Sequence, residues 1–286
     1  MKEKNSAQLA KRLLPVSAFL LTPFALADTH QIENTQLQSY QSEINVGYEY
    51  LDFEYDSVNA HHTSLRAIHY FSPLDVTDVP LAEAAFLNRA SSVSIAYQYG
   101  DYEAPAQDLE NKYRSLDVNY YVPNTMFFAG AGLRQDKSEG YYDYGGYGSY
   151  DYETDWETDW VGRLGVAPVD GLLIWSEFYE HVKVSDYWNL NAKYVKPLSS
   201  GRAFGIESSY QNAGSDVHQL HVIGDYYFSN KFSVGLGILH YEADNYEDKD
   251  ILLRTRYFLT DKISLDLTYT DQNYRDTWRL GASARF

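Results

Sequence analysis

The sequence predicts an all-β protein: a transmembrane antiparallel β-barrel of about 14 strands, with 12 and 16 also compatible, short periplasmic turns and long extracellular loops. Three observations predict this class. A secretory leader opens the chain, segments of alternating hydrophobicity recur along the remainder, and 28 Tyr, 13 Phe and 5 Trp accompany a negative mean hydropathy. A strand that is apolar on one face only produces this combination.

The leader occupies residues 1–27. An apolar run over 13–26 follows a basic start formed by Lys2, Lys4, Lys11 and Arg12. Ala25-Leu26-Ala27 is a small-x-small site, so we expect cleavage after Ala27 and one barrel domain over 28–286. The alternative is a membrane anchor, but the run is shorter than the roughly 20 residues that span a bilayer. We therefore expect export through the inner membrane to the outer membrane of a Gram-negative cell.

The net charge of the chain limits which macromolecules it can bind. The whole chain carries −17 and the leader +3, which leaves about −20 on the mature chain. A nucleic-acid partner is not expected, because phosphate binding needs Lys and Arg. The chain has no Cys, so neither a lipid-anchored N-terminus nor a disulfide is available.

The alternation is clearest in the last segment. One face carries Trp278, Leu280, Ala282, Ala284 and Phe286, and the other carries Arg279, Gly281, Ser283 and Arg285. Successive side chains of a strand point to opposite faces. In a membrane barrel the apolar face meets lipid and the polar face meets the lumen, which inverts the arrangement of a soluble sandwich. The pattern alone fits both folds; the leader, the segment lengths and the chain end favour the barrel.

Fourteen segments follow this pattern, and most have about ten residues, the length of a tilted membrane strand. They are 43–56, 62–72, 91–101, 112–122, 125–136, 156–167, 171–183, 186–196, 202–211, 216–228, 231–242, 249–260, 262–272 and 276–286. With a periplasmic N-terminus, the even-numbered connections are short. The odd-numbered ones include three longer, acidic loops at 102–111, 137–155 and 243–248.

The connection 73–90 is the exception among the periplasmic turns. Asp78 and Pro80 predict the start of a short helix through Leu87. We expect a periplasmic helical connection that rests on the rim. The alternative is a plug that folds back into the lumen.

Two parts of the chain resemble known outer-membrane proteins. Phe71-Ser72-Pro73, followed by Pro80-Leu-Ala-Glu-Ala-Ala-Phe-Leu-Asn-Arg-Ala-Ser91 and a Tyr-rich strand, resembles a family of general bacterial porin-like outer-membrane proteins. The alternating chain end resembles the assembly signal of such barrels, carried here by Trp278, Leu280 and Phe286. The resemblance implies location and fold more than any solute.

No catalytic constellation is recognisable. The His residues lack metal-ligand spacing: His218 and His221, three apart on a strand, face opposite sides. The sequence has no nucleophile elbow and no phosphate-binding Gly-rich loop. We expect no enzyme activity, no cofactor and no metal.

The polar face of the strands supplies the candidate site. On this register, the pore-lining residues are Glu49, Arg66, Asp117, Arg134, Arg163, Glu177, Lys193, Glu207, Asp225, Arg254, Arg256, Asp266, Arg279 and Arg285. Opposed charges across a lumen orient polar solutes and set ion preference. Alternatively, these charges pair and fill the barrel.

The sequence therefore predicts an outer-membrane porin for passive diffusion of ions and small hydrophilic solutes. A structural or adhesive barrel is the alternative, because external acidic, Tyr-rich loops could bind a partner. We expect the acidic, Tyr-rich segment 137–159 to be a solvated external loop, which can include two strands that continue above the membrane; the alternative is a loop that folds into the pore and constricts it. A carrier of hydrophobic ligands would need an apolar lumen. Expected partners are the lipid bilayer, lipopolysaccharide and the barrel-assembly machinery; a homo-oligomer, the solute and the ion preference stay open.

Overall fold

The computed structural model describes residues 39–54, 58–143, 148–180, 182, 187–214, 217–243, 246–273 and 275–286. The predicted leader, residues 1–27, lies outside them. Within these ranges, no helix has the length and apolar character needed to cross a membrane.

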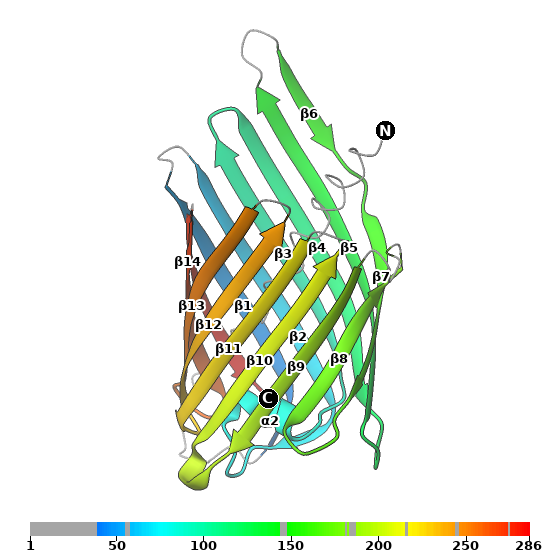
Figure 1. Ribbon diagram of the computed structural model, residues 1–286, viewed down its shortest axis with the longest axis vertical. Helices are drawn as coiled ribbons and strands as arrows, with labels where there is room; N and C mark the ends of the chain where they lie inside the picture. Colours follow the sequence, from blue (N-terminus) through cyan, green and yellow to red (C-terminus); the bar gives the residue numbers. More distant parts are fainter. Residues whose placement is uncertain are drawn as a thin grey trace.

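Fourteen antiparallel strands form a closed, tilted barrel, which confirms the predicted class and count (Figure 1). Each wall strand pairs with its sequence neighbour, and β1 pairs with β15 to close the wall. The additional strand, β6, pairs only with the far end of β5. The strands are β1 (Ser39–Phe53), β2 (Asn59–Asp75), β3 (Ser92–Ala104), β4 (Gln107–Tyr121), β5 (Phe127–Asp143), β6 (Ser149–Glu153), β7 (Glu157–Val166), β8 (Leu172–Tyr179), β9 (Tyr187–Pro197), β10 (Ala203–Ala213), β11 (Val217–Ser229), β12 (Phe232–Ala243), β13 (Tyr246–Phe258), β14 (Ile263–Gln272) and β15 (Arg275–Arg285).

The outer face of the wall is apolar, as the inverted pattern requires. Leu164 and Leu236 are 63% and 62% exposed, although such side chains are normally buried in a soluble protein. Aliphatic side chains occupy the middle of the outer face, and aromatic side chains lie near both ends of the strands. One aromatic belt includes Phe71, Phe127, Phe228 and Tyr257, and the other includes Trp160, Phe178, Trp188 and Trp278. Two such belts mark the two interfaces of a membrane.

The two ends of the barrel differ. At the short-turn end, where the C-terminus lies (Figure 1), brief turns such as 230–231 and 259–262 join the strands. At the opposite, hairpin end, the strands run further than the sequence predicts. β3 and β4 continue to Ala104 and from Gln107, so most of the expected loop 102–111 is a strand hairpin. The difference arises because the alternation of apolar and polar residues ends where the strands leave the membrane. The backbone hydrogen bonds between the strands continue beyond that point.

The segment 137–155 is also largely strand. β5 continues to Asp143 and pairs with β6, which returns before β7 enters the wall. The resulting β5–β6 hairpin projects beyond the other strands (Figure 1). This hairpin rises away from the barrel instead of folding into it as a constricting loop.

The connection between β2 and β3 contains a 3-10 turn, η1 (Leu81–Glu83), and one α-helical turn, α2 (Ala84–Leu87). These turns do not rest on the rim. Leu81 and Ala84 are buried with Tyr40 of β1, Tyr70 of β2 and Phe258 of β13, and Phe86 and Leu87 pack against inner residues of β8 to β11. A segment that contacts opposite walls at once lies inside the mouth (Figure 1). These turns therefore lie inside the mouth and not on the expected rim, because burial of Leu81 and Ala84 and partial burial of Phe86 outweigh exposure at the edge. We call residues 81–87 the mouth plug.

Candidate functional site

The inner wall of the barrel and the mouth plug form the candidate site. All fourteen predicted charged residues lie on the strand positions that alternate with the outward apolar row. The structure brings most of them into two groups of ion pairs and leaves a third group along the β13–β2 side of the wall.

The first group joins β4, β5, β7 and β8. Arg163 lies 2.8 Å from Asp117 and 2.7 Å from Glu177. Arg134 lies 3.7 Å from the other oxygen of Glu177 and donates to the Tyr179 hydroxyl at 3.3 Å. Glu177 is thus shared by donors from two strands, Asp117 is bound by Arg163, and the group is held against the wall.

The second group joins four strands to the mouth plug. Lys193 of β9 contacts Glu207 of β10 and Glu83 of the plug, each at 2.8 Å. Arg254 of β13 reaches Glu207 at 3.3 Å and forms a bidentate pair with Asp225 of β11. Each of these five side chains has at least one charged partner, which offsets the cost of removing them from water.

The third group follows the β13–β2 side, where the barrel closes. Arg285 pairs with Glu43 at 2.9 Å and also donates to the Leu81 carbonyl at 2.8 Å. Register places Arg279 opposite Glu49 and Arg256 opposite Asp266. Glu49 accepts from His62 at 2.9 Å, whereas Arg66 donates to Ser94 at 3.0 Å.

Three inner carboxylates lie across a glycine on the next strand. Asp225 faces Gly235, Asp117 faces Gly132 and Asp266 faces Gly281. A Cβ at Gly235 would overlap both the Asp225 carboxylate and the Arg254 side chain. The glycine lets the carboxylate lie across the neighbouring strand, where it can reach its arginine.

Sequence reasoning missed three residues of these groups. Glu83, Glu43 and Tyr227 are not among the predicted site residues, yet Tyr227 donates to Glu83 at 2.6 Å and Glu43 binds Arg285. A single carboxylate within the apolar run Leu81-Ala82-Glu83-Ala84-Ala85 is the signal that could have found Glu83. Such a residue is stable in a buried helix only with a partner.

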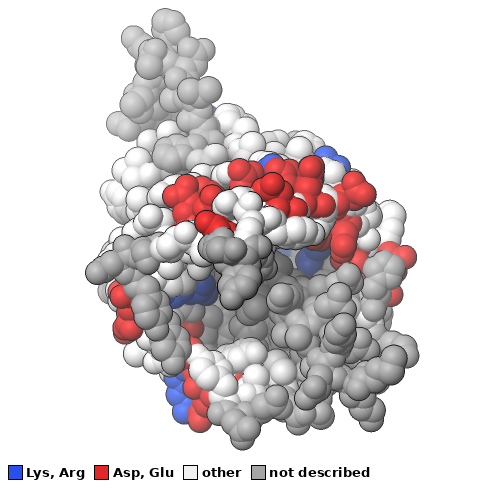
Figure 2. Space-filling model, turned by 90° about the horizontal axis from the view of Figure 1, so that it is seen from above, with Lys and Arg blue, Asp and Glu red and all other residues white. Residues whose placement is uncertain are grey.

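Acidic side chains predominate along the rim at the hairpin end (Figure 2). Acidic side chains gather along one arc of the rim, and basic side chains lie deeper in the central hollow (Figure 2). The bases of β4 and β5 near this end are engaged: Lys112 and Lys137 contact Glu139 at 3.0 and 2.9 Å. A solute entering from this end therefore meets carboxylates before it meets the paired charges of the inner wall.

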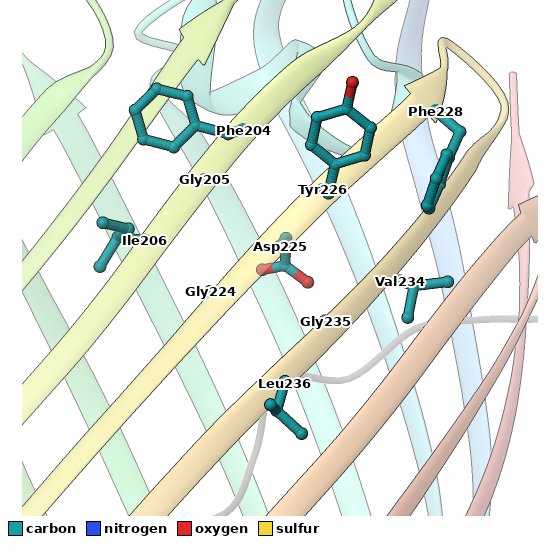
Figure 3. Close-up of a pocket in the computed structure, with 10 residues that line it drawn as sticks. All are labelled: Phe204, Gly205, Ile206, Gly224, Asp225, Tyr226, Phe228, Val234, Gly235 and Leu236. Carbon is teal, nitrogen blue, oxygen red and sulfur yellow. The ribbon is translucent and has the colours of Figure 1, made fainter.

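One further hollow lies on the outer face (Figure 3). Phe204, Ile206, Tyr226, Phe228, Val234 and Leu236 surround Gly224, whose missing side chain leaves open space. Asp225 belongs to the inner face and points away from this hollow. An acyl chain can fill such a depression, so it is part of the lipid surface.

The polar groups suit solvation and ion ordering more than bond chemistry. Among the described residues, no three His, Asp or Glu side chains converge to hold a metal ion. The inner wall instead offers cations and anions at fixed positions, held by their contacts with one another.

The sequence matches a known protein family over most of its length. Residues 11–286 match the model of the family described as "Putative general bacterial porin". The chain belongs to this porin family. No curated protein matches the sequence of this porin.

Solved structures agree on the fold. Outer membrane protein Omp33 of Acinetobacter baumannii is 21% identical, with 87% of this chain and 99% of that chain covered and a TM-score of 0.65. The CymD monoaromatic hydrocarbon channel is 9% identical, with 88% and 89% covered and a TM-score of 0.58. This porin is thus an outer-membrane channel whose partners include the lipid bilayer and small solutes.

Proposed function

We propose that this porin mediates passive diffusion of ions and small hydrophilic solutes. The observation that carries the proposal is the inner wall, where cations and anions contributed by β1, β2, β4, β5, β7–β11 and β13–β15 are interspersed around the lumen. Such a wall stays hydrated and orients polar solutes. The proposal assigns no catalytic residue, no cofactor and no metal.

The mouth plug sets the size limit in this proposal. It occupies the short-turn end and is held by Lys193, Tyr227 and Arg285 from three parts of the wall. Solutes would pass when the plug is displaced or through the space beside it. We therefore expect small conductance steps compared with a 16-stranded porin, since 14 strands also enclose a narrower lumen.

Planar-bilayer recording tests the proposal. Purified, folded protein should give stepwise ion conductance, with steps that scale with salt concentration. A sample unfolded by heat serves as the control and should give none. Folded protein that inserts without conductance steps would refute passive diffusion.

An adhesive function is the second candidate, favoured by one observation. The β5–β6 hairpin projects beyond the barrel and is stiffened by Tyr142 stacked on Tyr152, with centroids 5.8 Å apart. Deleting 139–155 separates the two roles. Conductance should persist in the deletion variant, whereas an adhesive function would lose surface binding; a large change in ion selectivity would place the hairpin in the pore.

Processing and assembly complete the proposal. We infer cleavage after Ala27, recognition of Trp278, Leu280 and Phe286 by the barrel-assembly machinery, and contact of the outer leaflet with lipopolysaccharide. N-terminal sequencing of the mature protein should begin at Asp28. Crosslinking in native membranes would reveal a homo-oligomer as a multiple of the monomer mass.

A further inference from the structure

The wall has an interrupted seam between β8 and β9. These strands pair over four positions, from Leu172 with Tyr194 to Trp175 with Asn191. β8 nevertheless continues to Tyr179 and β9 begins at Tyr187. Both strands stay paired on their other sides up to these ends. Every other neighbouring pair of wall strands in the described ranges has at least six paired positions.

A side chain replaces the backbone ladder at this seam. The Glu177 amide donates to Asn189 Oδ1 at 2.9 Å, and Asn189 Nδ2 donates to the Glu177 carbonyl at 3.0 Å. The hydroxyl of Ser176 donates to the Asn189 carbonyl at 2.7 Å. In a regular antiparallel pair, the main chains would exchange these bonds directly. The two main chains are therefore joined here through the side chain of Asn189, which also accepts a hydrogen bond from Asn191 at 2.8 Å.

Aromatic side chains flank the seam on both faces, and the outer face is apolar. On the inside, the rings of Tyr179 and Tyr187 meet edge-to-face with centroids 5.4 Å apart. On the outside, Phe178, Trp188 and Leu190 face lipid and are 42%, 43% and 49% exposed. The one charged side chain in the unpaired stretch, Glu177, is bound by Arg163 and Arg134. The level of Phe178 and Trp188 is that of the aromatic belt nearest the hairpin end.

We propose that the β8–β9 seam is a lateral portal that passes small, uncharged aromatic solutes between the lumen and the outer leaflet of the membrane. Opening needs rotation of Asn189 and Ser176 and separation of two tyrosine rings, with no break in the paired ladder below. The rings offer faces and edges to a planar solute, and Phe178 and Trp188 receive it on the lipid side. The mouth plug occupies the short-turn end of the axial route, whereas the seam lies at the level of lipid-facing aromatic side chains. This portal is additional to ion conduction and does not depend on it.

A reversible cross-link across the seam tests the portal. The chain has no cysteine, so the pair Ser176→Cys/Leu190→Cys is unique, and both positions lie on the outer face. The matched control is Ser208→Cys/Val222→Cys, which are register partners on the outer face of the regular β10–β11 ladder. Cells with an intact lipopolysaccharide leaflet are given N-phenylnaphthylamine, a neutral aromatic probe whose fluorescence rises when it enters the membrane.

Wild-type porin should raise the initial rate of fluorescence increase at least fivefold over cells without it. Oxidising the seam pair should return the rate to that background, reduction should restore it, and the control pair should have no effect. Ion conductance should be the same in both states, which separates this proposal from passive diffusion. An unchanged rate in the cross-linked seam would overturn the portal.

Asn189→Ala provides a second variant that needs no cross-link. Removing the bridging amide should speed probe entry severalfold, while heat-modifiable migration shows that the barrel is folded. A folded Asn189→Ala variant that admits the probe no faster than wild type would also overturn the portal.

Discussion

Glu83→Ala should favour a state in which the mouth plug has left its packed position inside the barrel. The substitution removes the 2.8 Å ion pair with Lys193 and the 2.6 Å hydrogen bond from Tyr227. Breaking a buried pair typically costs 3–5 kcal/mol, and Lys193 keeps Glu207, so we expect the lower end, about 3 kcal/mol. Because 1.4 kcal/mol is about a factor of ten, the ratio of unseated to seated plug should rise roughly 100-fold.

Single-channel recording measures this change. Glu83→Ala should show a larger mean conductance or longer open times than wild type at the same voltage and salt concentration. The matched control is Glu247→Gln, which removes an exposed ion pair with Lys249 at the hairpin end. An exposed pair contributes at most about 1 kcal/mol, so the control should leave the recording unchanged.

Two results would refute the reasoning about Glu83. If the folded Glu83→Ala barrel gave wild-type conductance and open times, the plug would not limit passage. If Glu83→Ala and Glu247→Gln had equal effects, the contacts inside the mouth would have no special role. Heat-modifiable migration in gels distinguishes both results from a failure to fold.

Three further predictions concern the wall. Leu236→Arg places a charge on the lipid face and should lower the free energy of unfolding in vesicles by about 2–4 kcal/mol. Leu239→Arg, on the inner face of the same strand, should lower it much less. Equal losses would contradict the assignment of the two faces. Gly235→Val should displace Asp225 from Arg254, lower the free energy of unfolding by about 1–3 kcal/mol and change the reversal potential in a salt gradient. Gly224→Val has open space around the new side chain and should change neither the stability nor the reversal potential. Phe286→Ser should lower the amount of folded porin in cells severalfold yet leave refolding into vesicles near normal; wild-type cellular yield would exclude an assembly role for the terminal residue.

The sequence by itself determined the wall of this porin. Alternation is a local property, because each strand residue points opposite to its neighbour whatever the rest of the fold does. Trp278 and Leu280 on one side and Arg279 on the other could therefore be assigned to lipid and lumen before any pairing was known. The strand count followed from the same local rule, since each alternating segment is one crossing.

Only the tertiary structure decided what fills and interrupts that wall. Glu83 and Tyr227 are 144 positions apart, and nothing local to either residue specifies the other. The plug enters the mouth because closure brings Lys193, Tyr227 and Arg285 around one buried carboxylate and one carbonyl. The break in the β8–β9 ladder is equally invisible to a period-two pattern, because Asn189 alternates correctly and differs only in replacing a backbone partner with its side chain.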